Sequence, residues 1–92
     1  MKARVVIYSK PGCHLCDEAK EVIVRAASDA GYEVGVDYSL EVINVESEGW
    51  MFEKYGNDIP VILINGVEVA RHWVDREKFL ESLKRAEPEP GA

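Results

Sequence analysis

The sequence predicts an α/β domain in which a mixed sheet of four strands carries helices on both faces. Three observations favour this fold class. Two short runs, the mostly apolar residues 3–8 and the continuously apolar Val61–Ile64, are typical of buried strands. Apolar side chains recur at helical spacing over residues 15–30. The dipeptide Asn65-Gly66 after the second run favours a two-residue hairpin, because a type I′ turn needs two residues with positive φ.

The first strand and the first helix are separated by Pro11 and Gly12, which together break regular structure. The helix is expected from residue 15, because steps of 4, 3, 1, 3 and 4 residues place its apolar side chains on one face. Gly31 then fits the position just beyond the end of a helix. The apolar side chains of this face are Leu15, Ala19, Val22, Ile23, Ala26 and Ala30.

The middle of the chain contains a second strand and a short helix. Residues 40–45 alternate and carry β-branched side chains, which predicts a strand, whereas residues 32–38 fit neither pattern. Ser47 is expected to cap a helix over residues 48–55, and Gly56 to close it.

The last elements are a strand over residues 67–70 and a helix capped by Asp75. Val74 and Phe79 stand at the positions of a hydrophobic staple around that cap. The resulting order is β-α-β-α-β-β-α. A βαβ unit followed by a hairpin and a helix implies a mixed sheet.

The 92 residues suffice for one domain and leave no room for a second core. We assign residues 1–86 to the domain and residues 87–92, where prolines alternate with acids, to a flexible tail. The chain has 11 Lys and Arg against 17 Asp and Glu, a formal net charge of −6. This excess of acid argues against nucleic acid and against a membrane surface as partners.

Two cysteines are too few for a disulfide scaffold. The apolar run near the N-terminus is too short for a signal peptide or a membrane span. We therefore expect a cytoplasmic monomer, in a compartment where thiols are kept reduced. A cysteine pair in such a compartment is more often catalytic or metal-binding than structural.

Both cysteines fall in one motif, Cys13-His14-Leu15-Cys16, between the first predicted strand and helix. The start of a helix offers unpaired N–H groups and a partial positive charge, which stabilise a thiolate. Positions i and i+3 face each other on a helix, so Cys16 can reach Cys13 while lying deeper. An exposed attacking sulfur and a protected resolving sulfur suit thiol–disulfide exchange.

The energies involved are sufficient for such a thiolate. Lowering a thiol pKa from about 8.5 to about 6.5 takes about 2.7 kcal/mol. A helix end supplies roughly 0.3–2 kcal/mol, and a hydrogen bond to a charged acceptor roughly 1.5–3 kcal/mol. His14 tunes the thiolate further if its imidazolium lies near Cys13; otherwise it is an exposed surface residue.

Two other interpretations of the cysteines stay open. They are either unrelated buried thiols or two ligands of a zinc ion. A structural zinc site needs four ligands, and only His14 and His72 are available to join the cysteines. Two ligands within one helical turn fit such a site poorly.

The stretch from Tyr8 to Cys16, Tyr-Ser-Lys-Pro-Gly-Cys-His-Leu-Cys, resembles the active-site segment of glutaredoxins, which belong to the thioredoxin superfamily. Residues 59–66 resemble the family's cis-proline dipeptide and the strand and turn that follow it. The resemblance covers residues 3–85 and points to a short, largely uncharacterised glutaredoxin-like branch. It implies the thioredoxin fold.

The resemblance also implies residue roles. Cys13 would be the nucleophile and Cys16 the resolving thiol. Lys10 corresponds to the family's lysine three residues before the nucleophile and, with His14, would tune the thiolate. The cis-proline would be Pro60.

By the same resemblance, the backbone of Ile59 would pair with the substrate as an added strand. Glutaredoxins usually carry Gly-Gly after the hairpin to hold glutathione, and this chain has Ala70-Arg71 there. Arg71 is therefore a candidate for binding a substrate carboxylate; the alternative for Arg71 and His72 is a simple surface position.

Aromatic residues elsewhere have structural interpretations. We expect Trp50, Met51 and Phe52 to belong to the core rather than to a binding site. Trp73 either edges the active groove or packs locally, and packing is the favoured interpretation.

Taken together, the sequence predicts a small thiol–disulfide oxidoreductase with a role in redox homeostasis and electron transport. Its substrates would be disulfide-containing proteins or mixed disulfides with glutathione. Its electrons would come from glutathione or from a reductase, with no bound cofactor. The competing classes are a non-catalytic thioredoxin-fold binding module and a metal-binding CxxC protein.

Overall fold

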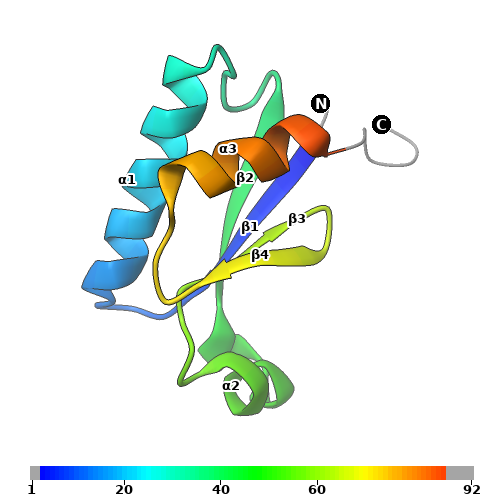
Figure 1. Ribbon diagram of the computed structural model, residues 1–92. Helices are drawn as coiled ribbons and strands as arrows, with labels where there is room; N and C mark the ends of the chain where they lie inside the picture. Colours follow the sequence, from blue (N-terminus) through cyan, green and yellow to red (C-terminus); the bar gives the residue numbers. More distant parts are fainter. Residues whose placement is uncertain (1–2, 87–92) are drawn as a thin grey trace.

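A computed structural model describes residues 3–86 and shows the predicted order of elements (Figure 1). The predicted tail over residues 87–92 lies outside the described residues. Within the described part of the chain, no helix has the length and apolar character needed to span a membrane. The elements are β1 (Ala3–Ser9), α1 (His14–Asp29), β2 (Tyr38–Asn44), the 3-10 helix η1 (Val45–Ser47), α2 (Gly49–Tyr55), β3 (Val61–Ile64), β4 (Val67–Arg71) and α3 (Arg76–Arg85).

The four strands form one mixed sheet in the order β2-β1-β3-β4. β1 pairs with β2 in parallel and with β3 antiparallel, and β4 pairs antiparallel with β3. The predicted mixed sheet is therefore confirmed. Because β1 and β2 are parallel, with Ser9 opposite Asn44, the segments that follow both strands emerge at the same end of the sheet.

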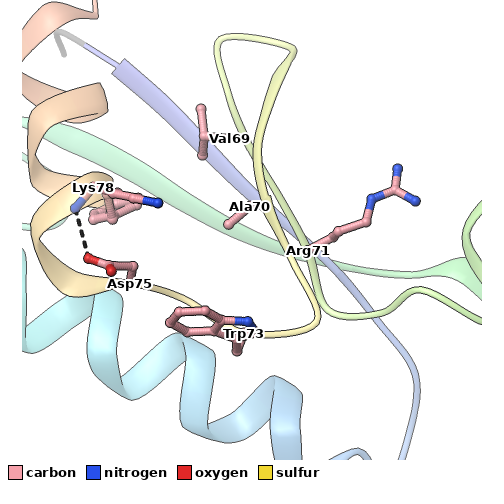
Figure 2. A pocket seen from close by; sticks show the side chains of 7 residues that line it. Val69, Ala70, Arg71, Trp73, Asp75 and Lys78 are labelled. Atoms are coloured by element: carbon pink, nitrogen blue, oxygen red, sulfur yellow. Dashed lines mark hydrogen bonds between the residues drawn. The ribbon is translucent and has the colours of Figure 1, made fainter.

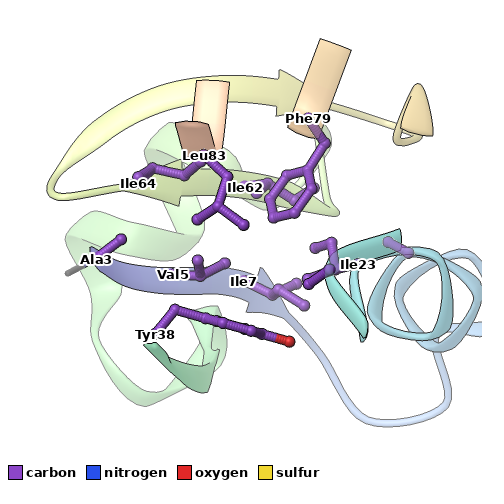
Figure 3. Close-up of a cluster of buried hydrophobic side chains, with 11 residues drawn as sticks. Ala3, Val5, Ile7, Ile23, Tyr38, Ile62, Ile64, Phe79 and Leu83 are labelled. Atoms are coloured by element: carbon purple, nitrogen blue, oxygen red, sulfur yellow. The ribbon is translucent and has the colours of Figure 1, made fainter. Parts of the chain in front are cut away.

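One face of the sheet carries the main core, and helices α1 and α3 cover it (Figure 1). Alternate residues of β1 and β3 point to this face, as period-two strands require. Figure 3 shows these side chains meeting Ile23 of α1 and the two buried residues of α3. Each buried aliphatic side chain contributes roughly 1.5–3 kcal/mol to stability. The larger members are Val5, Ile7, Ile23, Tyr38, Ile62, Ile64, Phe79 and Leu83.

The opposite face has a smaller cluster, formed by Val6, Val61 and Leu63. Tyr8 and Tyr55 pack against it, and their rings lie 4.8 Å apart between centroids. Tyr55 ends α2, which lies beyond one end of the sheet (Figure 1). Helix α2 thus contributes to the second face of the sheet only near that end.

The hairpin between β3 and β4 has the predicted turn. Asn65 and Gly66 both have positive φ, 51° and 84°. The Asn65 side chain accepts a hydrogen bond from the Arg4 N–H, and its own N–H donates to the Arg4 carbonyl, each at 2.8 Å. The hairpin is therefore fixed to the start of β1 as well as to its own strands.

The helix caps follow the prediction in α3 and differ in α2. The Asp75 carboxylate accepts from the Lys78 N–H at 3.1 Å. The expected Ser47 cap is wrong, because α2 begins after Glu48, which makes no side-chain cap. Ser47 instead donates to the Asn44 carbonyl within η1, at 2.7 Å. The chain forms this extra turn before the helix, which shifts the helix start by one residue.

The two aromatic residues expected in the core at α2 are exposed. Only Met51 is buried, whereas Trp50 and Phe52 are 56% and 51% exposed. Successive residues of a helix differ by about 100° in direction. A short helix that buries one residue therefore turns both neighbours towards solvent.

Gly12 has a φ of +77°, a conformation that disfavours side chains, although a Cβ would meet no atom within 4 Å. We expect Gly12→Ala to lower the free energy of unfolding by about 1–2 kcal/mol, through backbone strain alone. Urea denaturation of the oxidised protein measures this change.

The matched control is Gly49→Ala in α2, where a Cβ is equally free of contacts and φ lies outside the left-handed region. It should leave stability unchanged or raise it by up to about 1 kcal/mol. Equal effects of the two substitutions would contradict the assignment of strain to Gly12.

Candidate active site

The site begins where the central strand β1 ends. After Ser9, Pro11 and Gly12 form a turn that delivers Cys13 to the N-cap position of α1. The Cys13 sulfur accepts a hydrogen bond from the Cys16 N–H at 3.1 Å. The predicted placement of Cys13 at the helix start is thus confirmed, and its Sγ takes one of the unpaired N–H groups of the first turn.

Cys13 and Cys16 are joined by a disulfide, with their Cα atoms 5.3 Å apart. Cys16 is buried, 4% exposed, whereas Cys13 is partly exposed. The structure therefore brings the two sulfurs together and gives them the expected difference in depth. Because the two sulfurs are bonded to each other, two unrelated thiols are excluded.

The peptide bond between Ile59 and Pro60 is cis, as the resemblance implied. Pro60 is buried beside the end of β1, because the next residue, Val61, pairs with Tyr8. The Pro60 carbonyl accepts from the His72 N–H at 2.7 Å. Among residues 3–86, the Ile59 N–H and carbonyl have no hydrogen-bond partner, so both are free for an external chain.

Lys10 and His14, the two predicted tuning residues, are both exposed. Their side chains form neither hydrogen bonds nor ion pairs with other residues of the described chain. Lys10 lines a hollow of about 230 Å³ that also reaches the end of β2. Their effect on the thiolate stays a prediction.

Arg71 is held by two carboxylates of the chain itself. Its Nε and Nη2 donate to Glu68, each at 2.7 Å, and its Nη1 lies 3.1 Å from Asp58 Oδ2. The other Asp58 oxygen lies 3.1 Å from His72 Nε2. A substrate carboxylate would have to compete with both partners, so binding by Arg71 stays a prediction.

The electrostatics of this cluster follow from the geometry. The hydrogen bonds from Arg71, assisted by its charge, hold the pKa of Glu68 below its usual value of 4.5. The same hydrogen bonds raise the pKa of Arg71, which stays protonated. The charge-assisted pair thus fixes Arg71 against the surface of β4.

Sequence reasoning missed this cluster because of a bulge. Residues 68 and 71 are three apart and would point to opposite faces of a regular strand. An irregularity in the β3–β4 ladder places Glu68 opposite Leu63 and Arg71 opposite Val61, which are on one face. Asp58 then reaches Arg71 from the loop before the cis-proline. No local pattern signals these contacts.

A hollow of about 180 Å³ lies between β4 and the start of α3. Figure 2 shows Trp73 at one edge of it and Val69 at another, with the Arg71 guanidinium pointing away. Trp73 is 66% exposed, so the favoured interpretation of local packing is wrong. Leu15, expected on the buried face of α1, is also exposed. The helix buries Cys16 instead, one position further on.

Metal ligation was the second alternative for the cysteines. Across residues 3–86, no group of three or more His, Cys, Asp or Glu side chains is placed to hold a metal ion. Neither histidine therefore extends the cysteine pair into a ligand set within this range.

Comparison with known proteins gives one family and several relatives. The model of the glutaredoxin-like domain family (DUF836) matches residues 4–84. A glutaredoxin-like protein of Dictyostelium discoideum is 30% identical over 79 residues, which is 84% of this chain and 71% of that protein.

Solved structures show the same fold at low identity. A structural-genomics target from X. campestris (XcR50) has a TM-score of 0.68 at 24% identity, covering 89% of this chain and 97% of that one. The protein Ne2328 of Nitrosomonas europaea has a TM-score of 0.72 at 23% identity, covering 89% and 92%. These neighbours establish the thioredoxin-like fold.

Because hydrogen bonding by Arg71 is the main cause of the low Glu68 pKa, we expect Arg71→Gln to raise that pKa towards 4.5. Arg71→Lys, which keeps the charge and loses the paired geometry, should restore the low value only in part. Carboxyl NMR titration measures both.

The lowered pKa of Glu68 also makes its contribution to folding stability depend on pH. The Glu68 contribution is present above pH 4.5 and is lost as the pH falls through the folded-state pKa. Glu68→Gln should abolish this loss of stability at low pH. The free energy of unfolding, measured by urea denaturation below pH 4.5, tests this. An unchanged Glu68 titration in Arg71→Gln would contradict the assignment.

Proposed function

We propose, since the chain belongs to the glutaredoxin-like domain family (DUF836), that it acts as a small thiol–disulfide oxidoreductase. The observation that carries the proposal is the Cys13–Cys16 disulfide at the start of α1, with the outer sulfur accepting a helix N–H. A structural cross-link over so short a loop would constrain little chain. A redox pair needs this proximity and this difference in depth.

The exchange runs in two steps. In the reduced protein, the Cys13 thiolate attacks one sulfur of a substrate disulfide, and the other substrate sulfur leaves as a thiolate. Cys16 then loses its proton and attacks the Cys13 sulfur. The second substrate sulfur leaves, and the Cys13–Cys16 disulfide re-forms. Two electrons pass to the substrate, and its two thiolates take protons from water.

Return to the reduced state needs an external donor of two electrons. Two glutathione molecules or one dithiol reductase supply them by the same exchange in reverse. The family membership supports the first donor, and the replacement of the family's Gly-Gly by Ala70-Arg71 supports the second.

The cis-proline segment supports a positioning role next to the cysteines. Pro60 is buried and its carbonyl is fixed by His72, so the preceding residue is held in place. The free N–H and carbonyl of Ile59 can pair with an extended substrate chain. Lys10 and His14 would add positive charge near the thiolate.

Substituting each cysteine tests the assigned roles. Cys13→Ser should reduce disulfide turnover to background, because the attacking sulfur is gone. Cys16→Ser should keep the attack but not the resolution, so the mixed disulfide with Cys13 should accumulate. Mass spectrometry of the non-reduced protein detects it. If the mixed disulfide accumulated in Cys13→Ser instead, the roles of the two cysteines would be reversed.

The reactivity of Cys13 should depend on pH with a pKa clearly below 8.5, because the helix start stabilises the thiolate. In Cys16→Ser, the rate of alkylation by iodoacetamide should therefore reach its plateau near neutral pH.

An ordinary thiol pKa together with no disulfide turnover would favour the non-catalytic binding module. Stoichiometric zinc in freshly purified, reduced protein would favour the metal-binding alternative instead.

A further inference from the structure

We infer that the active-site end of this domain binds an extended apolar segment of a disulfide-containing protein, in preference to glutathione. The inference rests on the proposed oxidoreductase function and names its substrate class. We call the exposed side chains of Leu15, Val42, Trp50, Phe52 and Trp73 the apolar end.

Two members of the apolar end adjoin the reacting sulfur and the cis-proline. Leu15 lies between the two cysteines and is 54% exposed. Trp73 follows His72, whose N–H donates to the Pro60 carbonyl at 2.7 Å. Leu15 is therefore next in sequence to Cys16, and Trp73 is next in sequence to the residue that holds Pro60, with its side chain at the edge of the hollow between β4 and α3.

The other three members reach the same end by topology. Trp50 and Phe52 are on α2, which follows β2, and β2 ends level with β1. Val42 shares a hollow with Lys10 and Pro11, just before the cysteines. Five of the eight exposed large apolar residues within residues 3–86 thus belong to segments at, or just beyond, this end of the sheet.

The backbone at this end fits a polypeptide. The Ile59 N–H and carbonyl have no partner within the described chain and lie just before β3. An extended segment that pairs there turns alternate side chains the same way, about 6–7 Å apart. Such a segment can place a cysteine at Cys13 and apolar side chains on Leu15 and Trp73.

Charge disfavours glutathione and favours a basic segment. Glutathione carries two carboxylates and one ammonium group, and it has no apolar side chain. Arg71, at the position of the family's Gly-Gly, is already held by Glu68 and Asp58. The first turn of α1 carries the exposed Asp17, and the exposed Glu18 follows it, in a chain of net charge −6. Lys10 is the opposing charge near Cys13, but the acids of α1 together with the exposed apolar side chains favour a disulfide flanked by apolar and basic residues.

The test compares two disulfide-bonded peptides and one small disulfide. One peptide carries Leu, Phe and Lys beside its cysteines, the second carries Ser and Glu there, and the third substrate is hydroxyethyl disulfide. Wild type should favour the first peptide over the second and over glutathione disulfide, by about tenfold in kcat/KM. Trp73→Ser should lower the ratio of kcat/KM for the first peptide to that for hydroxyethyl disulfide by a similar factor.

The control is Val36→Ser, which removes an exposed apolar side chain from the loop at the opposite end of the sheet. It should leave that ratio unchanged. An equal loss with both substrates in Trp73→Ser, or a wild-type preference for glutathione disulfide, would overturn the inference while leaving the oxidoreductase proposal intact.

Two further outcomes would also overturn the inference, each for a different reason. No turnover of any disulfide by wild type would overturn the oxidoreductase function and, with it, the inference. A concentration-dependent dimer in sedimentation, dissolved by Trp73→Ser, would assign the apolar end to a second copy of the chain and overturn the inference.

Discussion

The hydrogen bond from the Cys16 N–H to the Cys13 sulfur, 3.1 Å long, is the contact on which the proposed chemistry depends. It exists because the central strand stops at Ser9, a turn through Gly12 follows, and Cys13 then caps α1, which starts at His14. The main core then keeps α1 in place through its buried face. The packing of the sheet against α1 therefore sets the position of the Cys13 sulfur.

A second constraint links the cis-proline loop to β4. His72 fixes the Pro60 carbonyl, and its ring meets Asp58, which also contacts Arg71. Three charged or titratable side chains and one backbone hydrogen bond thus join the loop before β3 to the end of β4. The ion pairs are partly exposed, so their value lies in orientation more than in stability. One member of the cluster, Arg71, belongs to the Ala70-Arg71 pair that stands where the resemblance to glutaredoxins implies Gly-Gly.

Several large apolar side chains of the domain are exposed, although burying them would add to its stability. Removing apolar surface from water contributes about 25 cal/mol per Å², and Leu15, Trp50 and Trp73 forgo much of that stabilisation. Leu15 stands between the two cysteines in sequence, and the proposed reaction brings a substrate to this pair. The surface that costs stability in the free protein is available to stabilise a complex.

Local signals in the sequence determined the elements, the hairpin at Asn65-Gly66, the Asp75 cap and the placement of both cysteines at the start of α1. Each depends on neighbours within about four residues, where periodicity and backbone preference act. Resemblance added the cis bond at Pro60. Only the tertiary structure decided that Glu68 and Arg71 share a face, because a bulge in the pairing with β3 shifts the register. It also decided which aromatic residues are exposed, because burial depends on which face of a helix meets the rest of the chain.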